Sequence, residues 1–151
     1  PIFNEVIKKN KKVKLMFIGT GDSLGDIKEK VKKLYLQDNI IFTGNIAHKE
    51  VPRYISAFNF GLCHLPNIFV YENSFPLKIL EYLSCDIPVL ASELKTHRDI
   101  AERLNRVYVY KNAQDILKTI KSKIGARPDL RKYSWDDIVT NYKKLWGAYN
   151  D

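Results

Sequence analysis

The sequence NSFPLKILEYLSCDIPVLAS, residues 73–92, predicts a loop, a helix, a tight turn and a buried strand in that order. Pro76 stands near the expected helix start, where a missing N–H does no harm. Phe75 and Pro76 place the helix N-terminus where backbone N–H groups could face an anion. Glu81 follows about one and a half turns later, within reach of the other end of the same ligand. The stretch therefore predicts a pocket for a phosphorylated sugar or nucleotide at a sheet edge.

Short apolar runs alternate with segments of helical spacing along the rest of the chain. Strands are expected at 13–18, 39–43, 60–65, 88–91 and 107–109, and helices at 1–10, 24–35, 50–57, 77–84, 96–104 and 116–124. A last helix is expected after Ser134, a good N-cap, with an apolar stripe that includes Trp135 and Trp146. This alternation favours an α/β domain with a parallel sheet between two layers of helices. Ligands of such sheets bind beyond the carboxyl ends of the strands, here 19–22, 44–48, 64–74 and 92–98.

Composition favours one domain over residues 1–151 with an anionic partner. The chain is 45% hydrophobic and has a net charge of +8, with a lysine cluster at Lys8, Lys9, Lys11, Lys12 and Lys14. A solvated lysine-rich surface is the alternative, and nucleic acid is not favoured, because no basic run is interleaved with aromatic residues.

Cys63 and Cys85 are expected to be buried free thiols in a reducing compartment. No apolar run is long enough to span a bilayer, so we expect a cytoplasmic protein, with peripheral contact at the inner membrane face as a further option.

Three blocks carry a resemblance to a known family: LMFIGTGD (15–22), NIIFTGNIAHKEVPRYISAFNFGLCHLPN (39–67) and the opening stretch. Together they resemble the nucleotide-sugar-binding C-terminal half of retaining glycosyltransferases of the glycosyltransferase-B type. YSWDDIVTNYKKLW (133–146) is similar to the closing helix of that family. The resemblance implies a Rossmann-like three-layer domain of a hexosyltransferase that moves a sugar from a nucleotide diphosphate to a glycan or lipid acceptor.

The resemblance also implies roles for single residues. Glu81 matches the second of two family glutamates and would hold the ribose hydroxyls. Asn73 stands at the position of the first glutamate and Glu72 is one position off; these two are the candidates for contact with the transferred sugar. A surface Glu81 paired with Lys78, and a turn or capping role for Asn73 or Glu72, are the alternatives from local spacing.

The remaining donor contacts are expected at two places. Phe75, Pro76, Leu77 and Lys78 would face the diphosphate, with one N–H fewer because of the proline. The loop at Gly44, Asn45 and Ile46 would face the base, and the glycine would allow a sharp turn. His64 ends a strand on the same side and is a further candidate contact.

No metal or cofactor is expected. His48, His64 and His97 fit no metal-ligand spacing. In this family, protein cations and a helix dipole offset the charge of the leaving diphosphate. Gly19 and Gly21 lack the third glycine of a dinucleotide fingerprint, so tight packing at a strand–helix turn is the better interpretation.

Family members also carry a first central strand and a loop with an Arg and a Lys, and no such block precedes Val13. We therefore expect those parts, and the acceptor-binding domain, to lie upstream in a longer protein, and the chain alone to be inactive. A nucleotide-sugar epimerase of the same fold and a non-catalytic scaffolding module are the alternatives. Asn73 in place of a glutamate favours the module.

Overall fold

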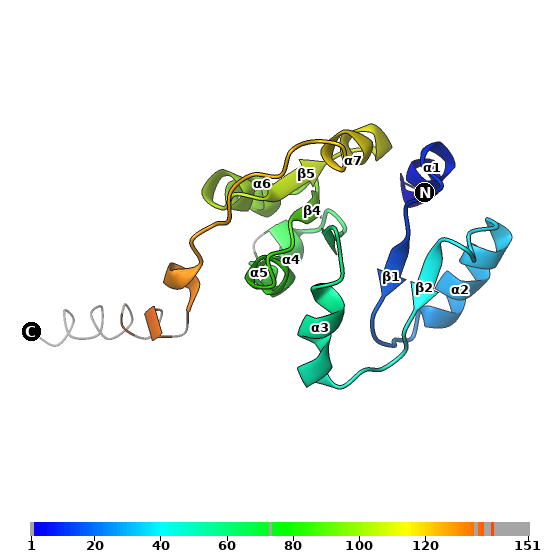
Figure 1. Cartoon of the computed structure of the whole chain (residues 1–151), viewed down its shortest axis with the longest axis horizontal. Helices are drawn as coiled ribbons and strands as arrows, with labels where there is room; N and C mark the ends of the chain where they lie inside the picture. The colour runs from blue at the N-terminus through cyan, green and yellow to red at the C-terminus, as the bar shows by residue number, and fades with distance from the viewer. Residues whose placement is uncertain (1, 73, 135, 138–139, 141–151) are drawn as a thin grey trace, which may run out of the picture.

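The computed structural model describes residues 2–72, 74–134, 136–137 and 140, and its architecture is mixed α/β (Figure 1). The strands are β1 (Leu15–Phe17), β2 (Ile40–Phe42), β3 (Gly61–Cys63), β4 (Val89–Ser92) and β5 (Val107–Tyr110). The α-helices are α1 (Ile2–Lys9), α2 (Leu24–Lys33), α3 (Val51–Ile55), α4 (Phe69–Glu72), α5 (Leu77–Ser84), α6 (Lys95–Arg103) and α7 (Ala113–Thr119). Two 3₁₀ turns, η1 (His48–Glu50) and η2 (Arg131–Tyr133), complete the described elements.

All described strand pairs are parallel, as the sequence predicts, but they form two sheets rather than one. β1 pairs with β2, with Leu15 opposite Ile40. β3, β4 and β5 form the second sheet in that order. Figure 1 shows the two sheets side by side with helices around them.

The three-stranded sheet is covered on both faces. Every residue of β4 is buried, and Val89 and Ala91 are fully inaccessible. One face packs on α5 and α6 through Ile79, Leu83, Ile100 and Leu104. The other face packs on α1 and α7 through Val6, Ile116 and Leu117. Burial on both faces explains why residues 87–91 are a continuous apolar run rather than an alternating one.

The two-stranded sheet has a smaller core, in which Ile7, Val31, Leu36 and Ile40 are buried. Helix α1 serves both sheets, because Val6 packs with the three-stranded sheet and the next residue, Ile7, packs with the two-stranded one. Helices α1 and α7 are in contact, which joins the halves at that end (Figure 1).

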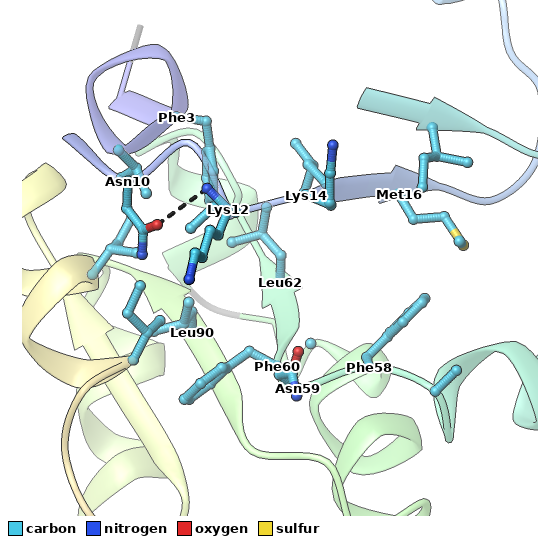
Figure 2. Close-up of a pocket in the computed structure, with 18 of the residues that line it drawn as sticks. Phe3, Asn10, Lys12, Lys14, Met16, Phe58, Asn59, Phe60, Leu62 and Leu90 are labelled. Atoms are coloured by element: carbon cyan, nitrogen blue, oxygen red, sulfur yellow. Dashed lines mark hydrogen bonds between the residues drawn. The ribbon is translucent and has the colours of Figure 1, made fainter. Parts of the chain in front are cut away.

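A cavity of about 590 Å³ separates β1 from β3. Its lining is mainly apolar and includes Met16 of β1, Leu62 of β3 and Phe60 (Figure 2). The facing edges of β1 and β3 are not paired with each other in the described structure. The expected single sheet is therefore interrupted at this cavity.

Most predicted elements are present with small shifts in their ends, and 77–84 is confirmed without change. Helix α4 was not predicted, and the expected helix at 116–124 ends at Thr119. Ser134 accepts a hydrogen bond from the Asp137 N–H at 3.2 Å, as an N-cap does; most of the predicted last helix lies outside the described residues. Cys63 and Cys85 are both free, but only Cys63 is buried. Among the described residues no helix is long and apolar enough to cross a bilayer.

Candidate functional site

The start of α5 is the centre of the predicted site. The helix begins at Leu77 and Pro76 is its N-cap, with extended backbone. No side chain of the described residues caps it. The Ile79 N–H donates to the Pro76 carbonyl at 3.0 Å, and the Leu77 and Lys78 N–H groups have no partner among the described residues, so these two are left for water or a ligand. The proline removes one possible donor next to them. Because the N-terminus of a helix carries partial positive charge, this end suits an anion.

Two charged side chains of α5 are exposed. The Glu81 carboxylate forms no ion pair or hydrogen bond with another described residue, so the predicted alternative, a pair with Lys78, is absent there. Burial raises the pKa of the Cys63 thiol to about 11, and the positive charge of Lys78 acts in the opposite direction. Lys78 stands in the first turn of α5, and this helix packs on β3, whose last residue is Cys63.

A glycine in β3 sets the position of α5. A Cβ at Gly61 would lie 2.2 Å from Cγ of Tyr82, the residue after Glu81. The Tyr82 ring therefore packs directly on the strand backbone, which only glycine permits. Sequence reasoning missed this contact, although glycine inside an apolar strand is a signal for close approach.

The loop before α5 is held by contacts with α6 and η2. Thr96 of α6 donates to the Ser74 carbonyl at 3.2 Å, and the Phe75 and Tyr133 rings lie 5.8 Å apart. Phe75 is 41% exposed. Part of its ring therefore serves packing, and the diphosphate contact would come from its backbone.

Gly44 has a φ of +69° at the end of β2, and Gly19 has a φ of +107° at the end of β1. The Gly19 N–H donates to the Gly44 carbonyl at 2.9 Å. A Cβ added at either position would meet open space, so the backbone conformation and not tight packing demands glycine at Gly19. A Cβ at Gly21 would also meet open space, so the prediction of tight packing is wrong at both glycines. Thr20 donates to the Asn45 side-chain oxygen at 3.0 Å, which joins the two turns.

A buried network joins the loops after β3 and β4. The Ser92 hydroxyl donates to the Leu65 carbonyl and accepts from the Leu65 N–H, each at 3.0 Å. The His97 ring lies 2.7 Å (Nδ1) from the Ser92 carbonyl and 3.6 Å (Nε2) from Cys63 Sγ. His97 is inaccessible to solvent, and burial lowers its pKa. A neutral His97 therefore joins the ends of β3 and β4.

His64 is exposed at the carboxyl end of β3, and its Nδ1 lies 2.7 Å from the buried Tyr110 hydroxyl. Burial raises the pKa of Tyr110, so the hydroxyl stays protonated and can donate to His64. That bond leaves Nε2 as the ring nitrogen available to a ligand. Nearby, Glu93 after β4 pairs with Arg98 and lies 3.9 Å from the Lys111 ammonium after β5.

The predicted site residues fall into two groups. Residues 74–81 form the start of α5 and the loop before it, beside the three-stranded sheet. Gly44, Asn45 and the half-buried Ile46 follow β2 of the other sheet. No hydrogen bond within the described residues joins the groups, and neither lines the cavity between the sheets. Glu72, half-buried, ends α4, and Asn73 lies outside the described residues.

Comparisons with known proteins identify the family of the chain and its fold. A family model described as "Glycosyl transferases group 1" matches residues 2–124. The chain is 30% identical over 132 residues to an alpha-monoglucosyldiacylglycerol synthase of Streptococcus pneumoniae, covering 87% of this chain and 29% of that protein. It is 27% identical to a putative teichuronic acid biosynthesis glycosyltransferase, TuaH, of Bacillus subtilis, covering 63% of this chain and 22% of the relative.

The fold is similar to that of HepE of Anabaena, whose crystal structure contains UDP. The TM-score is 0.57 at 16% identity, over 79% of this chain and 33% of HepE. The chain thus spans about a third or less of the length of these proteins.

Proposed function

Because the chain belongs to the glycosyl transferases group 1 family, we propose that it is the donor-binding domain of an enzyme that transfers a hexose from a nucleotide diphosphate sugar with retained anomeric configuration. The observation that carries the proposal is the first turn of α5. Its Leu77 and Lys78 N–H groups have no partner among the described residues, and the exposed Lys78 and Glu81 side chains stand on the same short helix.

The first turn of α5 and Glu81, further along the helix, suit different parts of the donor. The N-terminal N–H groups and Lys78 would bind the diphosphate and stabilise the charge that develops as it leaves. The Glu81 carboxylate would accept hydrogen bonds from both ribose hydroxyls. The loop at Gly44, Asn45 and Ile46 would contact the base, and Asn73 or Glu72 the sugar. His64 Nε2 is a further candidate contact.

The acceptor is proposed from the relatives' names alone, which refer to a diacylglycerol product and to teichuronic acid. A glycan or lipid-linked acceptor at the inner face of the membrane fits both. The proposal assigns charge neutralisation to α5 and Lys78 rather than to a metal, so transfer should persist in excess EDTA.

Calorimetric titration of the intact protein with UDP, GDP and ADP tests the donor site. At least one should bind, and Glu81→Gln should weaken it by about 10- to 100-fold, because a hydrogen-bonding charge worth about 1.5–3 kcal/mol is lost. Glu102→Gln is the matched control, since Glu102 is also exposed on a helix. Unchanged affinity in Glu81→Gln, or no binding of any nucleotide, would contradict the assignment of the donor site to α5.

A further inference from the structure

Four lysines line one pocket on a part of the molecule that the proposed donor site does not use. The pocket has a volume of about 670 Å³ and lies between the C-terminal end of α1 and helix α7. Its lining consists of Lys9, Asn10, Lys12, Gln114, Leu117, Lys118 and Lys121. Helices α1 and α7 contact each other, so two segments far apart in the sequence build it together (Figure 1).

The pocket is at the opposite edge of the fold from the donor site. Lys12 precedes β1, whereas Gly19 and the proposed ligand loops follow the strands. Asn10 accepts a hydrogen bond from the Lys12 N–H at 3.2 Å, which ties these two lining residues together (Figure 2). A ligand bound here would not touch α5.

The charge of the pocket is uncompensated within the described structure. No carboxylate is among its lining residues, and none of its four lysines forms an ion pair with a described residue. The neighbouring Asp115 is engaged in the capping box of α7, where it accepts from the Lys111 N–H at 2.8 Å. The last turns of two helices offset part of the positive charge, but about half a unit per helix does not match four ammonium groups. The remaining positive charge of the described lining favours an anion over a neutral ligand.

We propose that this pocket binds a phosphate-bearing polyanion. Lysine is a common phosphate binder that acts as a point charge, and the Asn10 and Gln114 side chains add neutral hydrogen-bonding groups. The volume falls in the range of small-ligand pockets. Among the described residues no aromatic side chain lines it, so the described lining lacks the stacking surfaces typical of single-stranded nucleic acid binding. The phosphate would come either from a free polyphosphorylated solute or from an anionic lipid headgroup.

Two probes distinguish the sources in the intact protein. Inorganic triphosphate, titrated by calorimetry at low salt with the donor site saturated by a tightly binding nucleotide, tests the free solute. Vesicles of 30 mol % phosphatidylglycerol in phosphatidylcholine, against pure phosphatidylcholine in a sedimentation assay, test the lipid. Binding of either probe supports the proposal and identifies the source, and binding of neither overturns it.

The matched variants are K9Q/K12Q/K118Q/K121Q and, as control, K28Q/K30Q/K32Q/K33Q on the exposed face of α2. Both remove four positive charges. At about fivefold per lysine at an anionic surface, the loss of four lysines should lower the affinity of the pocket variant by on the order of 600-fold, and the control should change less than about threefold. Equal losses in the two variants would overturn the proposal, because net charge alone would then explain binding.

Two further measurements keep the result interpretable. The pocket variant should bind the nucleotide as tightly as the unmodified protein, which separates failure of this pocket from failure of the donor site. If the fourfold variant does not fold, K12Q/K121Q and the conservative K12R/K121R replace it. The K12R/K121R variant should retain binding and the K12Q/K121Q variant should lose it. Identical affinities of these two variants would contradict anion binding by the pocket.

Discussion

The two sheets of this molecule are built from the same kind of strand but are buried to different depths. All four residues of β4, the middle strand of three, are buried, whereas all three residues of β1 are half-buried and Ile41 of β2 is 43% exposed. A parallel strand is best shielded from water when helices cover both faces and neighbouring strands cover both edges. β4 meets that condition and β1 does not, because the cavity lies along one of its sides.

The difference divides the proposed donor site. Helix α5 packs on the deeply buried half, and the loop at Gly44–Ile46 follows the less buried half. Regions with fewer buried contacts open more readily. The proposed diphosphate end of the site therefore stands on the better-packed half of the molecule, and the proposed base end on the less well-packed half.

The largest expected effect comes from truncating one isoleucine in each half. Ile79→Ala should destabilise the protein by about 4 kcal/mol, since Ile79 is fully inaccessible, whereas Ile41→Ala should cost about 1 kcal/mol. Urea unfolding followed by circular dichroism measures both. Equal losses of unfolding free energy in the two variants would show that the two halves are equally well packed, and the contrast between the sheets would be wrong.

A smaller effect is expected from adding a methyl group beneath α5. Gly61→Ala should destabilise by about 3 kcal/mol, because the new Cβ meets the Tyr82 ring. Gly21→Ala is the control, since nothing lies within 4 Å of its Cβ direction. Gly61→Ala should also weaken nucleotide binding in the protein that stays folded. A well-folded Gly61→Ala variant with native stability and affinity would show that Tyr82 does not set the position of the helix.

The smallest expected effect is a pH dependence confined to the three-stranded half. Burial lowers the pKa of His97 below the ordinary value of 6.5. The unfolded chain then takes up a proton that the folded one does not, so stability should fall as pH drops below about 6.5. Thermal melts between pH 7.5 and 5 measure this slope, which His97→Gln should flatten. If the melting temperature changes equally with pH in the unmodified protein and in His97→Gln, titrating groups other than His97 cause the pH dependence.

Local signals account for what the sequence could predict. The helix at 77–84 and the strand after it follow from apolar spacing and from Pro76, and both are present within one residue of their expected ends. Parallel pairing follows from the alternation of strands and helices, and the family follows from the order of three motif blocks.

Long-range packing explains what the sequence could not predict. The separation of β1 from β3 depends on what lies between them, and no local pattern encodes it. The Phe75–Tyr133 contact and the link from Ser92 to Leu65 join residues distant along the chain. The candidate site residues were predicted as motif positions, but their division between two sheets emerged only from the structure.

Helix α1 has a consequence for the order in which the molecule assembles. Its residue Val6 must meet Ile116 of α7, from the far end of the described fold, while Ile7 meets Val31 close by. Closing such a long loop carries a large entropic cost, and contacts of high sequence separation form slowly. The small sheet with α1 and α2 can therefore collapse early, and docking of α1 on α7 would be the late, rate-limiting event. Detachment of the same helix would then be the first step of unfolding.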